Sequence, residues 1–306
     1  MDSKIGGYAC KIAKLKMFSA TQFNLSRPEI ELNSERPVIL RSMDIDRQLL
    51  QQIVRDVAQT TLLPLFNNVS REYKKDGSII TLADRSMQEA LTDRLAEVCP
   101  DVALLGEEQS TQQQQALLDS GQPLWCLDPV DGTSNFAAGL PFFTVSLALI
   151  ESGEVKAGVV LDPIRDECFS AVRGQGAFLN DHPLIAEPTG LTLKRCIAFI
   201  DFKRLPAALS RQLVIDRPYG SQRNLGSIAL ELCWLAAGRG HLYLHGSQHI
   251  WDYAAADLIL SEAGGYAATL QGDAPFVHSL QPRSTCAAVD ESLFQQWQLY
   301  LQQVGE

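Results

Sequence analysis

Hydrophobic residues recur at helical spacing in the first part of the chain. Between residues 44 and 63 an apolar side chain returns about every four positions, and Pro64 follows. This spacing gives a helix one apolar face, so we predict a helix over 44–63. A second helix is predicted after Asp84, with Met87, Leu91 and Leu95 on its buried face and Pro100 at its end.

Continuous apolar runs mark the middle of the chain. Residues 102–105, 124–127 and 142–150 are predicted to be buried strands, and 109–122, which is rich in Gln, is predicted to be a surface loop or short helix. A turn at 151–154 leads into further strands at 155–161 and 167–172. Strands joined by short turns predict an antiparallel meander.

Strand and helix patterns alternate after about residue 186. Strands are predicted at 196–200, 241–244 and 285–289, and helices at 227–237, 251–263 and 291–304. Ser227 is a predicted N-cap, while Gly238 is a helix stop signal. This alternation favours an α/β arrangement with a parallel core.

Composition excludes several classes of protein. The chain has 306 residues, 46% hydrophobic and 20% charged, which is typical of globular proteins, and no apolar stretch approaches a membrane span. The seven cysteines are scattered without a CxxC motif, which predicts reduced thiols and a cytoplasmic protein. The net charge of −10 argues against general nucleic-acid binding. An anionic substrate would need a local positive charge, such as a bound metal ion.

Residues 1–42 differ from the rest. They hold seven basic and four acidic residues, so this segment is net positive while the remainder is strongly negative. It has no sustained hydrophobic period, and we predict a poorly ordered extension, with an organellar presequence as the alternative.

Carboxylates follow several predicted strands and begin a predicted helix. Glu107 follows one strand, Asp128 and Asp131 follow another, and Asp252 opens a helix. Mg²⁺ prefers such oxygen ligands. Pro129 cannot continue a strand ladder, so we predict a turn that brings Asp128 and Asp131 together. Each carboxylate alone is more typical of a turn, a solvated loop end or a helix start than of a metal ligand, and only their combination indicates a metal site.

The sequence resembles the inositol monophosphatase family, which comprises Mg²⁺-dependent, lithium-sensitive phosphatases. The motifs that carry this resemblance are Gly106-Glu107-Glu108, Asp128-Pro129-Val130-Asp131-Gly132-Thr133, Trp251-Asp252 and Glu262-Ala263-Gly264-Gly265. The similarity spans about 44–300. It implies an αβαβα sandwich, with a mostly antiparallel α+β subdomain at 43–188 and an α/β subdomain at 189–306 that completes the active site. It also implies a homodimer.

The resemblance implies a role for each matching residue. Two to three Mg²⁺ ions would be held by Glu107, Asp128, the Val130 carbonyl, Asp131 and Asp252. Glu107, Asp84 and Thr133 would be catalytic, with Thr133 orienting the attacking water. Substrate would contact Asp131, Gly132, Thr133, Gly226, Ser227, His245 and Asp252.

One position departs from the family pattern. His245 lies where inositol phosphatases carry a glutamate that binds inositol hydroxyls, which puts inositol specificity in question. His241, His245 and His249 recur at intervals of four, a zinc-like spacing if helical, but the segment is predicted to be strand and turn. Ordinary surface charge is the favoured interpretation of a basic stretch made of Lys203, Arg204, Arg211, Arg217 and Arg223. Arg223 lies three residues before Gly226, so it is also a candidate to bind a second anionic group of the substrate.

The expected activity is therefore hydrolysis of a small phosphate monoester by a metal-activated water, with inositol monophosphate as the default substrate. Histidinol phosphate, fructose 1,6-bisphosphate and 3′-phosphoadenosine 5′-phosphate are alternatives. So is a regulatory or binding member of the same fold with little turnover.

Overall fold

The structure, a computed structural model, describes residues 46–68, 72–73 and 79–305. The predictions for segment 1–42, including Cys10, lie outside the described residues. Within them, no helix is long and apolar enough to cross a membrane. The other six cysteines are thiols rather than halves of disulfides, and all are buried.

The larger sheet is an antiparallel meander with one parallel edge strand. Its order is β3-β4-β5-β6-β7-β8-β9, and only the β3–β4 pair is parallel. The strands are β3 (Ala103–Gly106), β4 (Leu124–Asp131), β5 (Thr144–Glu151), β6 (Glu154–Asp162), β7 (Glu167–Val172), β8 (Ala177–Leu179) and β9 (His182–Leu184). Every residue of β4 is buried, because helices cover both faces, and this explains the continuous apolar runs.

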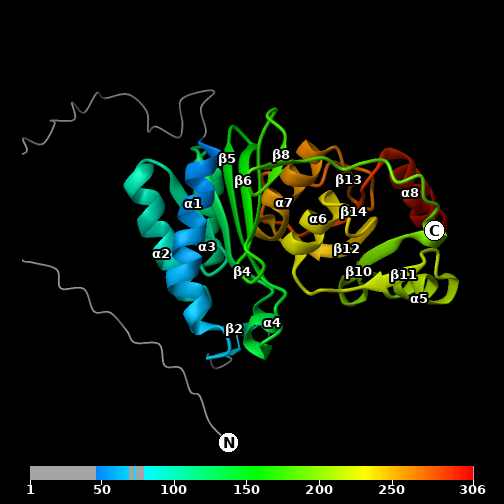
Figure 1. Cartoon of the computed structure of the whole chain (residues 1–306), viewed down its shortest axis with the longest axis horizontal. Coiled ribbons are helices and arrows are strands. Elements are labelled where there is room, and N and C mark those ends of the chain that lie inside the picture. The colour runs from blue at the N-terminus through cyan, green and yellow to red at the C-terminus, as the bar shows by residue number, and fades with distance from the viewer. Residues whose placement is uncertain (1–45, 69–71, 74–78, 306) are drawn as a thin grey trace, which may run out of the picture. The chain divides into compact units, whose positions relative to one another are not determined.

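Two helices cover the outer face of this sheet (Figure 1). They are α1 (Arg47–Val57), extended by a π turn (Ala58–Leu62) and a 3₁₀ turn (Leu63–Leu65), and α2 (Leu82–Val98). Asp46 caps α1 by accepting a hydrogen bond from the Leu49 amide. Short elements β1 (Glu72–Tyr73) and β2 (Ile79–Ile80) pair between them, and α3 (Thr111–Asp119) forms in the Gln-rich stretch.

The smaller sheet is mixed rather than wholly parallel. Its order is β11-β10-β12-β14-β13, where β10 runs parallel to both neighbours and β14 antiparallel to both of its own. The strands are β10 (Ile197–Asp201), β11 (Ser221–Arg223), β12 (Leu242–Gln248), β13 (Tyr266–Ala268) and β14 (Arg283–Ala288). The predicted parallel core therefore covers only the β11-β10-β12 half.

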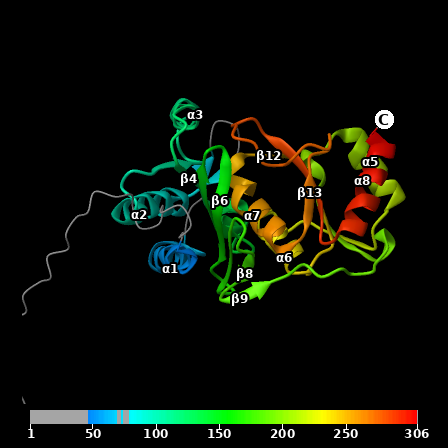
Figure 2. The ribbon, with the colours of Figure 1, turned by 90° about the horizontal axis from the view of Figure 1, so that it is seen from above.

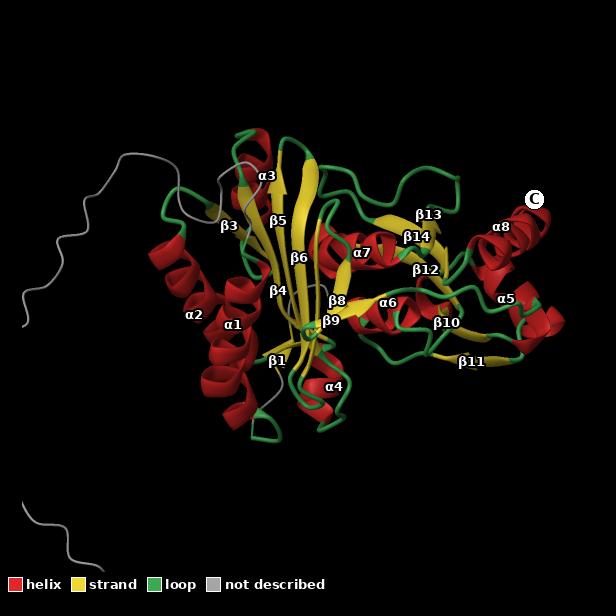
Figure 3. Cartoon of the chain, turned by 45° about the horizontal axis from the view of Figure 1, so that its top comes forward, coloured by secondary structure: helices red, strands yellow, loops and turns green. Residues whose placement is uncertain are grey.

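Two helices lie between the sheets, and two more cover the outer face of the smaller one (Figures 1 and 3). The inner pair is α6 (Ile228–Ala236) and α7 (Ile250–Ala263), and the outer pair is α5 (Ala207–Asp216) and α8 (Glu291–Gly305). Figure 2, seen from above, shows the same succession of helices, sheet, helices, sheet and helices. This confirms the predicted αβαβα sandwich.

The prediction of a turn at Pro129 was wrong in one respect. Strand β4 continues through Pro129 to Asp131, and its pairing with β5 shifts register between Asp128 and Asp131. A bulge accommodates the missing proline amide within the strand. The two aspartates are thus presented from a distorted strand end, and α4 (Thr133–Ala138) begins directly afterwards.

Candidate active site

The end of β4 supplies the centre of the candidate site. Asp128 is 3% exposed and its Oδ1 accepts a hydrogen bond of 3.0 Å from the Val130 amide. Gly132, which follows Asp131, adopts a φ of +96°. Glycine alone takes this conformation readily, so the chain can turn from the strand into α4.

Asp84 and Thr133 join α2 to this strand end. Asp84 is fully buried in the first turn of α2, where its Oδ2 accepts 2.7 Å hydrogen bonds from both the amide and the hydroxyl of Thr81. The Thr133 hydroxyl lies 3.1 Å from Asp84 Oδ1 and 3.0 Å from the Val130 carbonyl oxygen. Thr133 is therefore oriented by two oxygens, and these residues meet across 49 positions of sequence.

Asp131 caps the N-terminus of α6. Its carboxylate accepts hydrogen bonds from the Ser227 hydroxyl (2.6 Å) and from the amides of Ile228 (3.1 Å) and Ala229 (2.7 Å). Ser227 is the N-cap residue, as predicted, but its side chain makes no capping bond of its own. The capping oxygens come from the other sheet, so Asp131 links the two halves of the fold.

Asp252 occupies the first turn of α7. Its Oδ2 accepts a 2.7 Å hydrogen bond from the His249 amide. Asp252 thus faces the cluster from a helix start, as its position in the sequence indicated.

These carboxylates raise one another's pKa. Burial and the charges of Glu107 and Asp131 raise the pKa of Asp128 well above its usual range. Burial, followed by the charges of Asp131 and Glu107, does the same for the pKa of Asp252. Burial raises the pKa of Asp131 to about 6 and also raises that of Asp84. The ionised carboxylates therefore repel one another, and a bound cation would reduce this electrostatic repulsion.

The side chains of the carboxylate cluster do not converge on a single point. Among the described residues, no three His, Cys, Asp or Glu side chains gather closely enough to form a ready metal-binding group. The oxygens of Asp84, Asp128, Asp131 and Asp252 are turned toward nearby amide and hydroxyl donors instead.

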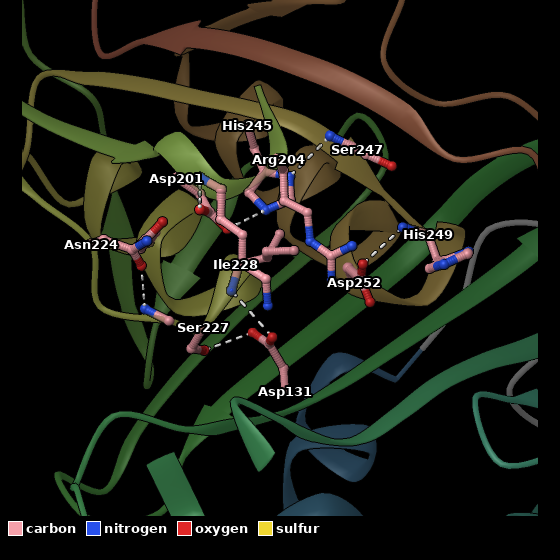
Figure 4. Close-up of a pocket in the computed structure, with 13 residues that line it drawn as sticks. Asp131, Asp201, Arg204, Asn224, Ser227, Ile228, His245, Ser247, His249 and Asp252 are labelled. Atoms are coloured by element: carbon pink, nitrogen blue, oxygen red, sulfur yellow. Dashed lines mark hydrogen bonds and ion pairs between the residues drawn. The ribbon is translucent and has the colours of Figure 1, made fainter. Parts of the chain in front are cut away.

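A cavity of about 190 Å³ opens beside Asp131 and Asp252. Five of the predicted site residues line it, namely Asp131, Gly226, Ser227, His245 and Asp252. Glu107, Asp128, Val130, Gly132, Thr133 and Asp84 are not among its lining residues. Figure 4 shows that the lining side chains come from β4, from the starts of α6 and α7, and from the ends of β10 and β12.

Sequence reasoning missed most of the opposite wall of this cavity. The missed lining residues are Asp201, Lys203, Arg204, Asn224, Ile228, Glu231, Ser247 and His249. Lys203 and Arg204 had been noted only as a basic stretch, while the candidate Arg223 is not a lining residue and bonds Ser221 and Gln222 instead. The only signal was the strand pattern at 196–200, which predicts an end near Asp201 but not its neighbours.

The sequence profile of the inositol monophosphatase family matches residues 42–302. This chain belongs to the inositol monophosphatase family. It is therefore a phosphoric monoester hydrolase, as the resemblance implied.

Members of the inositol monophosphatase family with different names are similar to the chain. Nus factor SuhB of Pasteurella multocida (strain Pm70) is 34% identical over 229 residues, which are 74% of this chain and 80% of that protein. The fructose-1,6-bisphosphatase/inositol-1-monophosphatase of Thermotoga maritima is 34% identical over 215 residues, 68% of this chain and 78% of that protein.

Solved structures of the inositol monophosphatase family share the fold. A Thermotoga maritima IMPase superposes with a TM-score of 0.72 at 29% identity, covering 84% of this chain and 97% of that one. SaIMPase-II bound to inositol monophosphate gives a TM-score of 0.69 at 25% identity, covering 83% and 93%.

Proposed function

We propose that this protein hydrolyses a small phosphate monoester with the help of two to three Mg²⁺ ions. The observation that carries this proposal is the group of buried carboxylates at the end of β4 and the start of α7, whose pKa values are raised by burial and by one another. The ion pairs that bury carboxylates elsewhere in the described chain join Asp162 to Arg165, Glu167 to Arg239 and Asp201 to His245. The group of carboxylates at β4 and α7 is suited to cations that are not part of the chain.

The donor set fits Mg²⁺. We assign the ions to Glu107, Asp128, the Val130 carbonyl, Asp131 and Asp252, which offer only the hard oxygen ligands that Mg²⁺ prefers. When bound, the ions would lower the pKa of a water and neutralise the charge of the phosphate.

The chain's own residues orient the reactants. The Thr133 hydroxyl, held between Asp84 and the Val130 carbonyl, is suited to position the attacking water, and Asp84 to accept a proton from it. The water oxygen forms the new bond to phosphorus, the ester P–O bond breaks, and the leaving oxygen takes up a proton. The amides of Gly132 and Thr133 are candidates for contacts with the phosphate.

The default substrate is inositol monophosphate. The names of relatives support a small phosphorylated substrate, since one from Bos taurus is named inositol monophosphatase 1 and one from Thermotoga maritima fructose-1,6-bisphosphatase/inositol-1-monophosphatase. Histidinol phosphate and 3′-phosphoadenosine 5′-phosphate remain alternatives.

Mg²⁺-dependent phosphate release tests the proposal. Purified protein is titrated with Mg²⁺ and then with Li⁺, and Asp128→Asn is compared with Asp162→Asn. Asp162 is also fully buried, but it binds the Ile164 and Arg165 amides and is not a cavity-lining residue. We expect Asp128→Asn to lower kcat at least 100-fold, and Asp162→Asn to keep most of its activity wherever it remains folded. Near-normal turnover by Asp128→Asn would sink the metal-site assignment.

A regulatory role is the second candidate, because three relatives carry the name Nus factor SuhB. A binding protein with little turnover would release no phosphate from any ester at any Mg²⁺ concentration. The same titration therefore distinguishes the two functions.

A further inference from the structure

The cavity has two walls of opposite charge. Asp131 and Asp252 lie on the wall formed by β4 and α7, and Lys203 and Arg204 lie beyond the end of β10. In Figure 4 the Arg204 side chain extends toward the middle of the cavity, on the side of Asp252. The basic group is thus within electrostatic reach of the proposed phosphate site.

Lys203 and Arg204 are not used by the fold. Both side chains are exposed, and neither forms an ion pair with a carboxylate of the described residues. Other basic residues in the same molecule are paired, as Arg165 is with Asp162 and Arg239 with Glu167. Cations that line a cavity without structural partners are available to an anionic ligand.

The backbone holds these two cations in place. Asp201 ends β10 and accepts a 2.8 Å hydrogen bond from the Lys203 amide, which caps the 3₁₀ turn Phe202–Arg204. The next residue, Leu205, is buried and anchors the turn from its other end. The side chains of Lys203 and Arg204 are therefore presented from a fixed turn at the rim.

Asp201 and His245 close the floor between the walls. The Asp201 Oδ2 lies 3.3 Å from His245 Nε2, while His245 Nδ1 accepts a hydrogen bond from the Ser247 amide. His245 is 4% exposed, and its donor nitrogen is therefore Nε2, directed at Asp201. Each oxygen of Asp201 thus already accepts one hydrogen bond from the protein, so Asp201 is held in place between the two walls.

We infer that the preferred substrate is a small phosphate monoester whose leaving group carries a second anionic group, bound by Lys203 and Arg204. This inference rests on the proposed function and narrows it to one substrate class. The carboxylate wall would take the scissile phosphate through its cations, and the basic wall would take the second anion directly. A cavity of this size, below the roughly 300–1,000 Å³ of common ligand sites, favours a compact substrate.

Matched substrate pairs test the inference. The first pair is fructose 1,6-bisphosphate against fructose 1-phosphate, and the second is 3-phosphoglycerate against glycerol 3-phosphate, each compared by kcat/KM with Mg²⁺ present. The pairs separate a second phosphate from a carboxylate as the recognised anion. We expect the doubly anionic member of at least one pair to be preferred about tenfold or more.

Variants assign the preference to residues. Lys203→Gln/Arg204→Gln should lower the ratio of the two kcat/KM values about tenfold or more, mainly through KM, because the contact is made equally in the ground and transition states. Arg204→Lys keeps a positive charge at this position, so it should retain part of the substrate preference that the double variant loses. Arg211→Gln is the control, since Arg211 is exposed on α5 but does not line the cavity, and it should leave the ratio unchanged.

Several outcomes would overturn the inference. They are a wild-type ratio near one for both pairs, a ratio unmoved in the double variant, or the same fall in Arg211→Gln. Hydrolysis of p-nitrophenyl phosphate, which carries one anionic group, is followed in parallel. If the protein hydrolyses that ester but does not prefer the doubly anionic substrates, only this inference is contradicted. If no ester releases phosphate in the presence of Mg²⁺, the proposed function is contradicted as well.

Discussion

Gly132 is the residue at which the backbone leaves β4 for α4, and its surroundings leave no room for a side chain. A Cβ atom there would lie 2.8 Å from the Phe142 carbonyl oxygen and 3.2 Å from that of Gly226, with φ at +96°. Both carbonyls belong to the backbone, so they cannot make room as the far end of a flexible side chain could. The residue whose amide is proposed to contact the phosphate is thus also one where the backbone has no room for a Cβ atom.

We predict that Gly132→Ala lowers the free energy of unfolding by on the order of 3 kcal/mol and abolishes phosphate release. Gly153→Ala is the control, because Gly153 also has a positive φ (+74°) but has nothing within 4 Å of its Cβ position. That variant should lose only about 1 kcal/mol. Urea unfolding measures both, and equal losses would show that the steric contacts at Gly132 do not matter.

At the residue scale, the sequence predicted correctly that two acidic residues of one short motif lie close together. Asp128 and Asp131 are three positions apart, and their common location followed from that spacing. Lys203 and Arg204 were not assigned to the cavity, because their place there depends on β10 lying beside β12, a pairing over more than 40 residues that no local pattern encodes. Arg223 was chosen instead for its nearness in sequence to Gly226.

At the scale of elements, the start of α6 joins the two sheets through Asp131. Periodicity and Ser227 predicted where this helix begins, but not that the capping carboxylate would come from β4. Propensity rules describe neighbours within a segment, and this cap spans 98 positions. The same limit applies to Pro129, whose place in a bulge depends on its pairing with β5.

We predict that Ser227→Ala weakens activity most at low pH. The Ser227 hydroxyl lowers the pKa of Asp131, which burial has raised to about 6, so its loss raises that pKa further. More Asp131 is then protonated at pH 6.5, where it would bind Mg²⁺ poorly, whereas at pH 8 it stays mostly ionised.

The measurement is the pH profile of kcat/KM at subsaturating Mg²⁺. The acid limb of Ser227→Ala should move to higher pH, with a loss several-fold larger at pH 6.5 than at pH 8. Ser170→Ala serves as the control, because Ser170 is a buried serine whose hydroxyl accepts hydrogen bonds from Gln51 and Arg47 and, among the described residues, bonds no carboxylate. Parallel profiles for wild type and Ser227→Ala would contradict the prediction.

For the whole molecule, the layered sandwich was predictable because the motifs that resemble the family span both sheets, while the alternation of helix and strand patterns alone predicted only an α/β second half. The boundary between subdomains at 188 and 189 stays a prediction, as does the homodimer. The mixed character of the smaller sheet was not predictable, since a parallel or antiparallel direction depends on which strand β14 joins.

The carboxylate cluster should also govern the stability of the whole protein. Asp128, Asp131 and Asp252 have pKa values above those of an unfolded chain, and burial raises that of Glu231 to about 8. The folded state then binds more protons than the unfolded state between the two sets of pKa values. Stability must therefore fall as pH rises through this window, from about 5 to 8.

We predict that protein in EDTA melts several degrees lower at pH 8 than at pH 6.5, since about 1 kcal/mol shifts Tm by roughly 2–4 °C in a domain of this size. Mg²⁺ should raise Tm at pH 8 more than at pH 6.5, because ions compete with protons for the same oxygens.

Asp128→Asn removes one of the repelling charges, so in EDTA it should melt higher than wild type at pH 8 although it is inactive. Differential scanning calorimetry at the two pH values measures all three effects. A Tm in EDTA that is constant or rises toward pH 8, or an Asp128→Asn variant less stable than wild type there, would show that the cluster is not under electrostatic strain and would weaken its assignment as a cation site.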